Sequence, residues 1–243
     1  MHKVLIGALL MGAVLVSPAY AETASVAVAA NFTAVAEQLA TLFEAETGDT
    51  VTLSFGATGG LYTQISQDAP FDILLAADDI RPAKAVAEGL GVAGSVFTYA
   101  TGSLALYSTS LDVSDGEAAL TGAFDKLAIA DPKSAPYGQA AVETLTALGL
   151  FDALTPKLVM GENISQTLQF VESGNAELGF VAASQVIGKP HVWIVPADLH
   201  EPIRQDAVLL KHGADNAAAT GFIDFLKSDA AVTVIEAAGY TVE

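Results

Sequence analysis

Short apolar runs alternate with amphipathic stretches along most of the chain. The apolar runs are four to six residues long and are bounded by glycine, proline or polar residues, which favours buried strands over helices. The predicted strands are residues 25–30, 51–55, 71–76, 127–130, 157–160, 178–181 and 192–195. This pattern predicts repeated strand–helix units rather than an all-helical or all-strand protein.

Between the predicted strands, apolar residues recur at helical spacing. Asn31 is predicted to cap a helix that Gly48 ends, and Asn163 is predicted to cap another that ends near Gly174. Further helices are expected around residues 61–65, from Pro82, over residues 138–148, and as a pair on either side of residues 228–229.

Alternating strands and helices indicate an α/β fold with mostly parallel sheets flanked by helices. No low-complexity linker divides the chain, as expected when a chain crosses twice between two lobes. The crossings are predicted near residues 101–102 and 197–200. The first lobe would then comprise residues 22–101 and 198–243, and the second residues 102–197.

The N-terminal segment has the order of a secretory signal peptide. Lys3 gives a positive start, residues 4–16 are apolar, and Ala19-Tyr20-Ala21 fits a cleavage site. The apolar run is short for a membrane span, which needs about 20 residues. We therefore expect cleavage of residues 1–21 after Ala21 and a soluble periplasmic protein; the alternative is a buried N-terminal helix.

Composition excludes several functions. Cleavage removes Lys3, one of the ten basic residues, so the formal charge falls from −18 to −19. Such a chain repels nucleic acid. With 52% hydrophobic residues it can still build a core, and without cysteine it has no thiol nucleophile or thiolate metal site.

The sequence shows no pattern of catalytic residues. It has no Gly-x-Ser-x-Gly elbow, no His-Glu-x-x-His motif and no phosphate-binding Gly-x-x-x-x-Gly-Lys loop. His191, His200 and His212 lie in or beside predicted loops without forming a ligand pair. The adjacent acidic residues Asp78 and Asp79 are expected in a solvated turn. These residues therefore give no support for an enzyme.

The junctions between predicted strands and helices carry short motifs in a fixed order. They are VAANF (28–32), SFGATG (54–59), APFDILLAAD (69–78), ADP (130–132) with PYG (136–138), PKLV (156–159) and GENI (161–164). Together they resemble the periplasmic molybdate-binding proteins of ABC importers, and the resemblance covers essentially the whole mature chain.

The resemblance implies a two-lobed, hinge-bending periplasmic-binding-protein fold with an oxyanion in the cleft between the lobes. The ligand would be molybdate, and tungstate would bind as well because the two anions match in charge and nearly in size. The partner would be the membrane permease of an ABC importer. The protein would be a monomer without a cofactor. Helix N-termini at the carboxyl ends of strands suit this role, because their free N–H groups attract anions.

From the first lobe, the resemblance assigns Asn31, Thr58 and Ala77 to the ligand. Asn31 would donate from its side-chain amide and its backbone N–H, although helix capping is the alternative role. Thr58 would donate from its hydroxyl, the alternative being an ordinary turn threonine. Ala77 can offer only its backbone N–H.

From the second lobe, the resemblance assigns Tyr137 and Ile164. Many family members have a small residue at position 137 and a tyrosine at position 182, where this chain has Tyr137 and Ala182. We interpret this as one phenol moved between two walls of a pocket; a packed aromatic is the alternative. Ile164 would donate its N–H. Asn31, Thr58 and Tyr137 would hold the metal only through hydrogen bonds to the molybdate oxygens.

Three other functions stay open on the sequence alone. The chain could bind another tetrahedral oxyanion or a small organic acid in the same type of cleft. A secreted α/β hydrolase would need an activated nucleophile that the sequence does not show. A secreted anion sensor would need a membrane partner for its output.

Overall fold

Two separate five-stranded sheets form the core of the protein in the computed structural model, which describes residues 21–242. The first sheet has the order β2-β1-β3-β10-β4. Its strands are β1 (Thr23–Ala29), β2 (Thr50–Gly56), β3 (Ile73–Leu75), β4 (Phe97–Gly102) and β10 (Ile203–Leu209). The helices of this lobe are α1 (Thr33–Thr47), α2 (Thr58–Ile65), α3 (Ile80–Ala87), α8 (Ala217–Phe225) and α9 (Asp229–Ala237).

The second sheet has the order β7-β6-β8-β5-β9. Its strands are β5 (Leu104–Tyr107), β6 (Leu127–Ala130), β7 (Leu158–Gly161), β8 (Leu178–Ala182) and β9 (Val192–Ile194). The helices of this lobe are α4 (Gly116–Thr121), α5 (Pro136–Ala147), α6 (Phe151–Leu154) and α7 (Ile164–Glu172). Short 3₁₀ turns complete the chain: η1 (Ala30–Phe32), η2 (Thr155–Lys157), η3 (Ala183–Gln185), η4 (Ala197–Leu199) and η5 (Lys211–Gly213).

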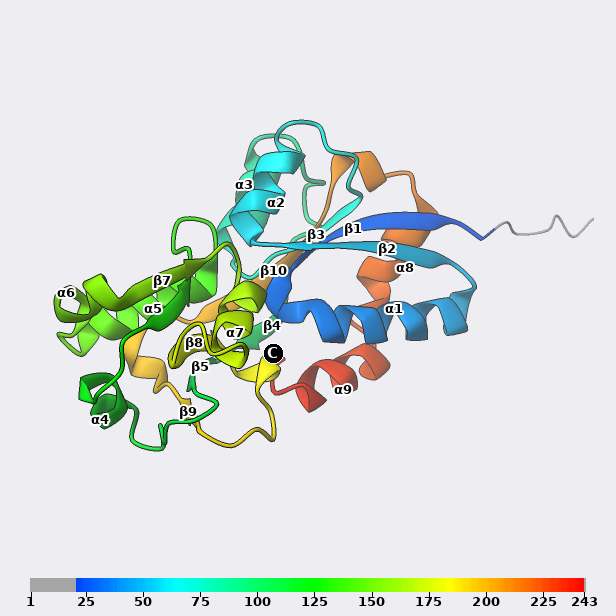
Figure 1. The fold of residues 1–243 in the computed structure, drawn as a ribbon. Coiled ribbons are helices and arrows are strands. Elements are labelled where there is room, and N and C mark those ends of the chain that lie inside the picture. Colours follow the sequence, from blue (N-terminus) through cyan, green and yellow to red (C-terminus); the bar gives the residue numbers. More distant parts are fainter. Residues whose placement is uncertain (1–20, 243) are drawn as a thin grey trace, which may run out of the picture.

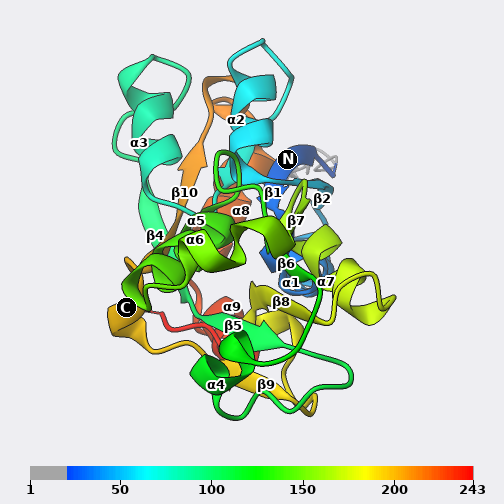
Figure 2. The ribbon, with the colours of Figure 1, turned by 60° about the vertical axis from the view of Figure 1, so that its left-hand side comes forward.

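The two sheets belong to two lobes that lie side by side (Figures 1 and 2). The chain passes from the first sheet to the second between β4 and β5, and returns between β9 and β10. The C-terminal tail lies against the first of these passages, where Thr101 and Thr241 exchange backbone hydrogen bonds of 2.7 and 3.0 Å. Three chain segments therefore meet at the junction between the lobes.

The α/β class and the two lobes are confirmed, and each sheet is mixed, with four strands running in one direction and one strand running against them. In the first sheet β1 runs parallel to β2 and β3, while β10 runs antiparallel to β3 and β4. The second sheet repeats this arrangement with β5 antiparallel to β8 and β9. In each sheet the strand that follows a crossing between lobes, β5 or β10, is inserted against the direction of its neighbours.

Local signals placed most of the other elements correctly. Gly48 ends α1 in the left-handed conformation with φ 82°, which glycine adopts without strain. Asn163 caps α7 by accepting from two backbone N–H groups. The two C-terminal helices α8 and α9 flank Ser228 as expected.

Each lobe has its own hydrophobic core, and one core reaches across the cleft. In the first lobe Phe43 packs against Phe222 and Phe225 beneath the sheet. The second core also contains Ala29 and Ala77, which belong to strand ends of the first lobe. Small side chains at these positions let the lobes approach closely, so the structure is a closed form.

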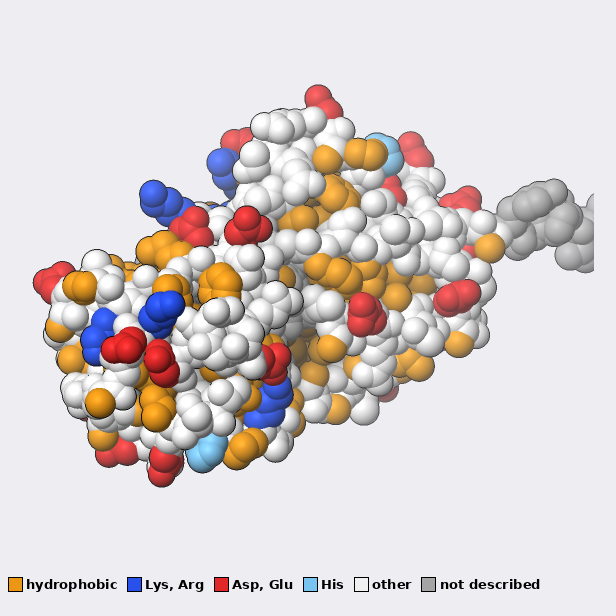
Figure 3. All heavy atoms as spheres, viewed as in Figure 1, with side chains coloured by type: hydrophobic (Ala, Val, Ile, Leu, Met, Phe, Trp, Pro, Cys, Tyr) orange, Lys and Arg blue, Asp and Glu red, His pale blue; other side chains and the backbone are white. Residues whose placement is uncertain are grey.

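The predicted signal peptide falls almost entirely on residues 1–20, which lie outside the described residues. Within residues 21–242, no helix has both the length and the apolar character needed to cross a membrane. Acidic side chains are scattered over both lobes on the face shown in Figure 3 rather than gathered at one point.

Candidate functional site

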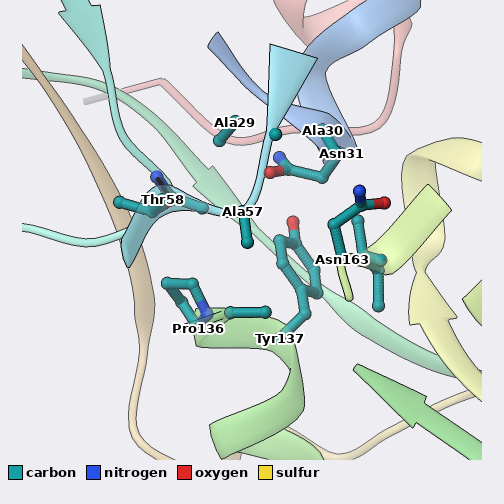
Figure 4. Close-up of a pocket in the computed structure, with 12 residues that line it drawn as sticks. Ala29, Ala30, Asn31, Ala57, Thr58, Pro136, Tyr137 and Asn163 are labelled. Atoms are coloured by element: carbon teal, nitrogen blue, oxygen red, sulfur yellow. Dashed lines mark hydrogen bonds between the residues drawn. The ribbon is translucent and has the colours of Figure 1, made fainter. Parts of the chain in front are cut away.

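A small pocket lies between the lobes, where strand ends of the first lobe face helix starts of the second (Figure 4). All of the residues predicted to hold the ligand line it. The lining residues are Ala29, Ala30, Asn31, Gly56, Ala57, Thr58, Ala77, Ala135, Pro136, Tyr137, Asn163 and Ile164. The structure thus brings the predicted residues from five separate segments to one place; their contact with a ligand stays a prediction.

The pocket is tightly closed and has no charged side chain in its lining. Its volume is about 10 Å³, at the lower limit for holding one water molecule. Organic ligands usually occupy several hundred Å³. The pocket therefore suits a compact inorganic ion, for which the lobes would separate slightly.

Helix and turn starts from both lobes supply the donors. Thr58 is the first residue of α2, Tyr137 lies in the first turn of α5, and Ile164 is the first residue of α7. First-turn N–H groups have no partner within their helix. Across residues 21–242, no protein acceptor is bonded to the backbone N–H of Asn31, Thr58, Tyr137 or Ile164. These groups and the helix dipoles give the pocket positive character without a charged residue.

The Thr58 hydroxyl and the Ala77 N–H act together. The backbone N–H of Ala77 donates to Thr58 Oγ1 at 3.0 Å, and both residues are buried. Ala77 therefore has a protein acceptor in this closed form instead of a free donor. Because Oγ1 accepts from Ala77, the hydroxyl proton of Thr58 remains available to an acceptor in the pocket.

Asn31 does not cap α1, and this prediction is wrong. It lies within the turn η1, while α1 begins at Thr33 without a side-chain cap. The Asn31 side-chain amide instead donates to Gln205 Oε1 at 2.9 Å and to the Tyr240 hydroxyl at 3.0 Å. Both amide hydrogens are thus bonded within the protein, and the backbone N–H of Asn31 is the donor left for a ligand.

Tyr137 points its phenol toward Asn31 across the cleft (Figure 4). Its hydroxyl accepts a hydrogen bond of 3.1 Å from Gln205 Nε2. Burial raises the pKa of Tyr137 well above 10, with smaller contributions from the neighbouring phenols of Tyr240 and Tyr99. The phenol therefore keeps its proton at neutral pH. Ala182 ends β8, is fully buried and does not line the pocket.

Sequence reasoning missed the polar residues directly behind the pocket. Gln205 is fully buried on β10 and lies within hydrogen-bonding distance of the Tyr99 hydroxyl. Tyr240 bonds to Asn31, a partner of Gln205, and also to Ser184. A buried glutamine in a strand was a weak signal, because the polar run Arg204-Gln205-Asp206 follows the first residue of β10 and this segment was not predicted as a strand. Tyr240 gave no signal, since it lies near the C-terminus, far along the chain from its partner Asn31.

Hydrogen bonds across the cleft hold the lobes together. The Gly59 N–H donates to Ser134 O at 2.8 Å, and Arg81 Nη2 donates to Lys133 O at 3.2 Å. On the other side of the pocket, Ser165 Oγ donates to Ala30 O at 3.1 Å. These bonds surround the pocket and would have to break when the lobes open.

The remaining polar residues singled out in the sequence lie outside the pocket. His212 bonds to Asp72 at 2.7 Å, and no group of metal-ligating side chains occurs in the part of the chain that the structure describes. Asp78 is buried and ion-paired with Arg81, so the expectation of a fully solvated acidic pair is wrong for Asp78; Asp79 is exposed. The Asp78 carboxylate also accepts the Arg81 backbone N–H, and this bond and the ion pair compensate for the loss of contact with water.

Two lobes joined by crossing strands and closed over a pocket of neutral donors define a two-lobed solute-binding protein. The chain belongs to the bacterial extracellular solute-binding protein family, whose pattern matches residues 24–241. This confirms the prediction of a binding protein rather than an enzyme.

Relatives support a more specific assignment within this family. Molybdate-binding protein ModA of Rhodobacter capsulatus is 53% identical over 239 residues, covering 97% of this chain and 94% of that protein. ModA of Azotobacter vinelandii is 52% identical over 229 residues, with 91% of each chain covered. The solved structure of an Azotobacter vinelandii periplasmic molybdate-binding protein has a TM-score of 0.88 at 38% identity, covering 90% of this chain and 99% of that chain.

Proposed function

We propose that this protein binds molybdate, and also tungstate, in the pocket between its lobes and delivers the anion to an ABC importer. The observation that carries the proposal is the pocket lining, in which donors from both lobes converge without a charged side chain. The names of its relatives supply the anion. Its location in the periplasm rests on the predicted signal peptide and on the related periplasmic protein.

The ligand would be held by two kinds of donor. The backbone N–H groups of Asn31, Thr58, Tyr137 and Ile164 would each donate to an anion oxygen from a turn or helix start. The hydroxyls of Thr58 and Tyr137 would add a donor from each lobe. Each hydroxyl already accepts a hydrogen bond from an N–H group, at 3.0 Å in Thr58 and 3.1 Å in Tyr137. Such bonds polarise the hydroxyls and strengthen their own donation.

Closure would convert ligand binding into a signal for transport. The anion bridges both lobes, so it stabilises the closed form in which the two lobes present one joint surface. A membrane permease that prefers this surface would select loaded protein over empty protein. The protein would act as a monomer and would need no cofactor.

A ligand scan of the mature protein, residues 22–243, tests this function. Dialysed protein would be heated with molybdate, tungstate, sulfate or phosphate, with sodium chloride at equal ionic strength as the control. Molybdate and tungstate should raise the Tm, because a ligand at a thousand times its Kd stabilises the folded state by about 4 kcal/mol. An unchanged Tm with both anions at millimolar concentration would refute the proposal. A shift with sulfate, phosphate or an organic acid alone would point to the alternative ligand.

A further inference from the structure

A continuous network of buried polar groups lies directly behind the anion pocket. It joins Asn31 and Tyr240 to Gln205, and Gln205 to Tyr137 of the other lobe. Gln205 is 0% exposed and lies on β10, close to where the chain re-enters the first lobe. It is the member that bonds both to the first-lobe residue Asn31 and to the second-lobe phenol.

The direction of these bonds is fixed from one end. The backbone carbonyl of Asn31 can only accept, so Tyr240, 3.0 Å away, donates its single proton there. The Tyr240 oxygen must then accept from its other neighbours, including Asn31 Nδ2 at 3.0 Å. This places the amide nitrogen of Asn31, not its oxygen, toward the interior of the network.

The same logic orients Gln205 and then Tyr137. Asn31 Nδ2 donates its second hydrogen to Gln205 Oε1, 2.9 Å away, so the side-chain carbonyl of Gln205 faces Asn31. The hydroxyl of Tyr99 lies 2.9 Å from the Ala76 carbonyl and 3.1 Å from this oxygen, so its single proton is shared between these two acceptors. Gln205 Nε2 therefore faces Tyr137, 3.1 Å away, and an amide nitrogen can only donate. The phenol oxygen of Tyr137 accepts, so its own proton can be donated to the neighbouring Tyr240 hydroxyl or to an acceptor in the pocket.

Gly102 provides the space for this contact. It pairs with Ile203 at the end of β4, two residues from Gln205. A Cβ atom at this position would lie 2.0 Å from the Tyr137 hydroxyl and 2.6 Å from Gln205 Nε2. The φ angle of Gly102 is not in the left-handed region, so the close approach of these two side chains, not backbone conformation, is what requires glycine there.

We propose that Gln205 is a positioning residue of the oxyanion site, which holds the Tyr137 phenol with its proton directed at the bound anion. This inference rests on the proposed function, since it needs an anion as acceptor. The contact joins β10 of the first lobe to α5 of the second in the closed form. Gln205 thus makes Tyr137 a donor in the closed form, without touching the ligand itself.

A double-mutant cycle separates this role from simple packing. The variants are Gln205→Met, Tyr137→Phe and the pair, with Gln38→Met on the exposed face of α1 as the matched control. Molybdate affinity would be measured by isothermal titration, and the ligand-free Tm would show that each variant folds. Wild-type binding of molybdate is measured first. If it is absent, the proposed function fails and the cycle is not interpreted.

Tyr137→Phe should weaken binding by about tenfold or more, since it removes a hydrogen bond to a charged group. Gln205→Met should weaken binding by about threefold to tenfold in the wild-type background. In the Tyr137→Phe background it should change affinity little, because no phenol proton remains to be oriented. Gln38→Met should bind as wild type.

Two outcomes would overturn the inference. One is a Gln205→Met protein that binds as tightly as wild type. The other is an equal loss of affinity with and without the Tyr137 hydroxyl, which would make Gln205 a packing residue only. If Gln205→Met does not fold, Gln205→Leu replaces it in the cycle, because it removes the same amide with a side chain of different shape. The same two criteria then apply.

Discussion

Replacing Thr58 with valine removes the first lobe's hydroxyl donor while keeping the branched shape of the side chain. Thr58 is 1% exposed, and its hydroxyl is the donor that the Ala77 N–H directs toward the pocket. A hydrogen bond to a charged group is worth about 1.5–3 kcal/mol. The molybdate affinity of Thr58→Val should therefore fall by about tenfold to hundredfold.

The same substitution should also lower the stability of the ligand-free protein. The N–H of Ala77 donates to Thr58 Oγ1 and has no other acceptor in the described residues. Leaving a buried donor unpaired costs about 1–3 kcal/mol. Thr58→Ser is the matched control, because it keeps the hydroxyl and removes only a methyl group. It should lose about 1 kcal/mol of stability and keep its affinity.

Titration calorimetry with molybdate gives the affinities, and urea unfolding without ligand gives the free energies of unfolding. Wild-type affinity in Thr58→Val would refute the donor role of the hydroxyl. If Thr58→Ser bound as weakly as Thr58→Val, packing of the methyl group, rather than hydrogen bonding, would control the site.

Three further predictions follow from the helix cap, the cleft and the charge. Asn163→Ala removes the α7 cap and should lower the free energy of unfolding by about 1 kcal/mol; unchanged urea unfolding would contradict this. Arg81→Lys keeps a positive partner for Asp78 but loses the planar guanidinium group that reaches Lys133 O in the other lobe. Release of molybdate, measured by stopped flow, should therefore be faster. An unchanged release rate would show that this hydrogen bond does not help to keep the lobes closed. Raising sodium chloride from about 0.05 to 0.5 M should not weaken molybdate binding, because salt screens repulsion from the acidic protein; a steep loss of affinity would indicate a basic site.

The sequence predicted those elements whose signals are local. Apolar strands, the glycine stop at Gly48 and the cap at Asn163 depend on a few neighbouring residues. Strands β4, β5 and β10 were not predicted. In β10, the polar residues Gln205 and Asp206 are buried by partners distant in sequence. Asn31 was mispredicted for the same reason. Asparagine is a common residue type at helix N-caps, but the side-chain amide of Asn31 donates to Tyr240, 209 residues away along the chain.

The candidate site was predictable to the extent that it lies at strand–helix junctions. The five residues predicted to bind the ligand all lie in motifs at these junctions, and the fold brings them together around one pocket. Which hydrogen atoms face the pocket was not predictable, because that depends on groups behind it. The bonds from Ala77 to Thr58 and from Gln205 to Tyr137 are tertiary contacts with no trace in the local sequence.

Under the proposed function, the absence of charged side chains from the pocket lining would let an acidic protein hold a dianion and release it. A lysine or arginine buried there would carry a large desolvation cost in the empty protein, or would pair with one of the many carboxylates. Fixed N–H and O–H dipoles have no such cost, because they are already oriented by the helix starts and the network behind them. Each lobe would supply only part of the donor set, so neither lobe alone would neutralise the proposed anion. Binding would therefore be strong only while the lobes are closed, and opening the cleft would be sufficient for release.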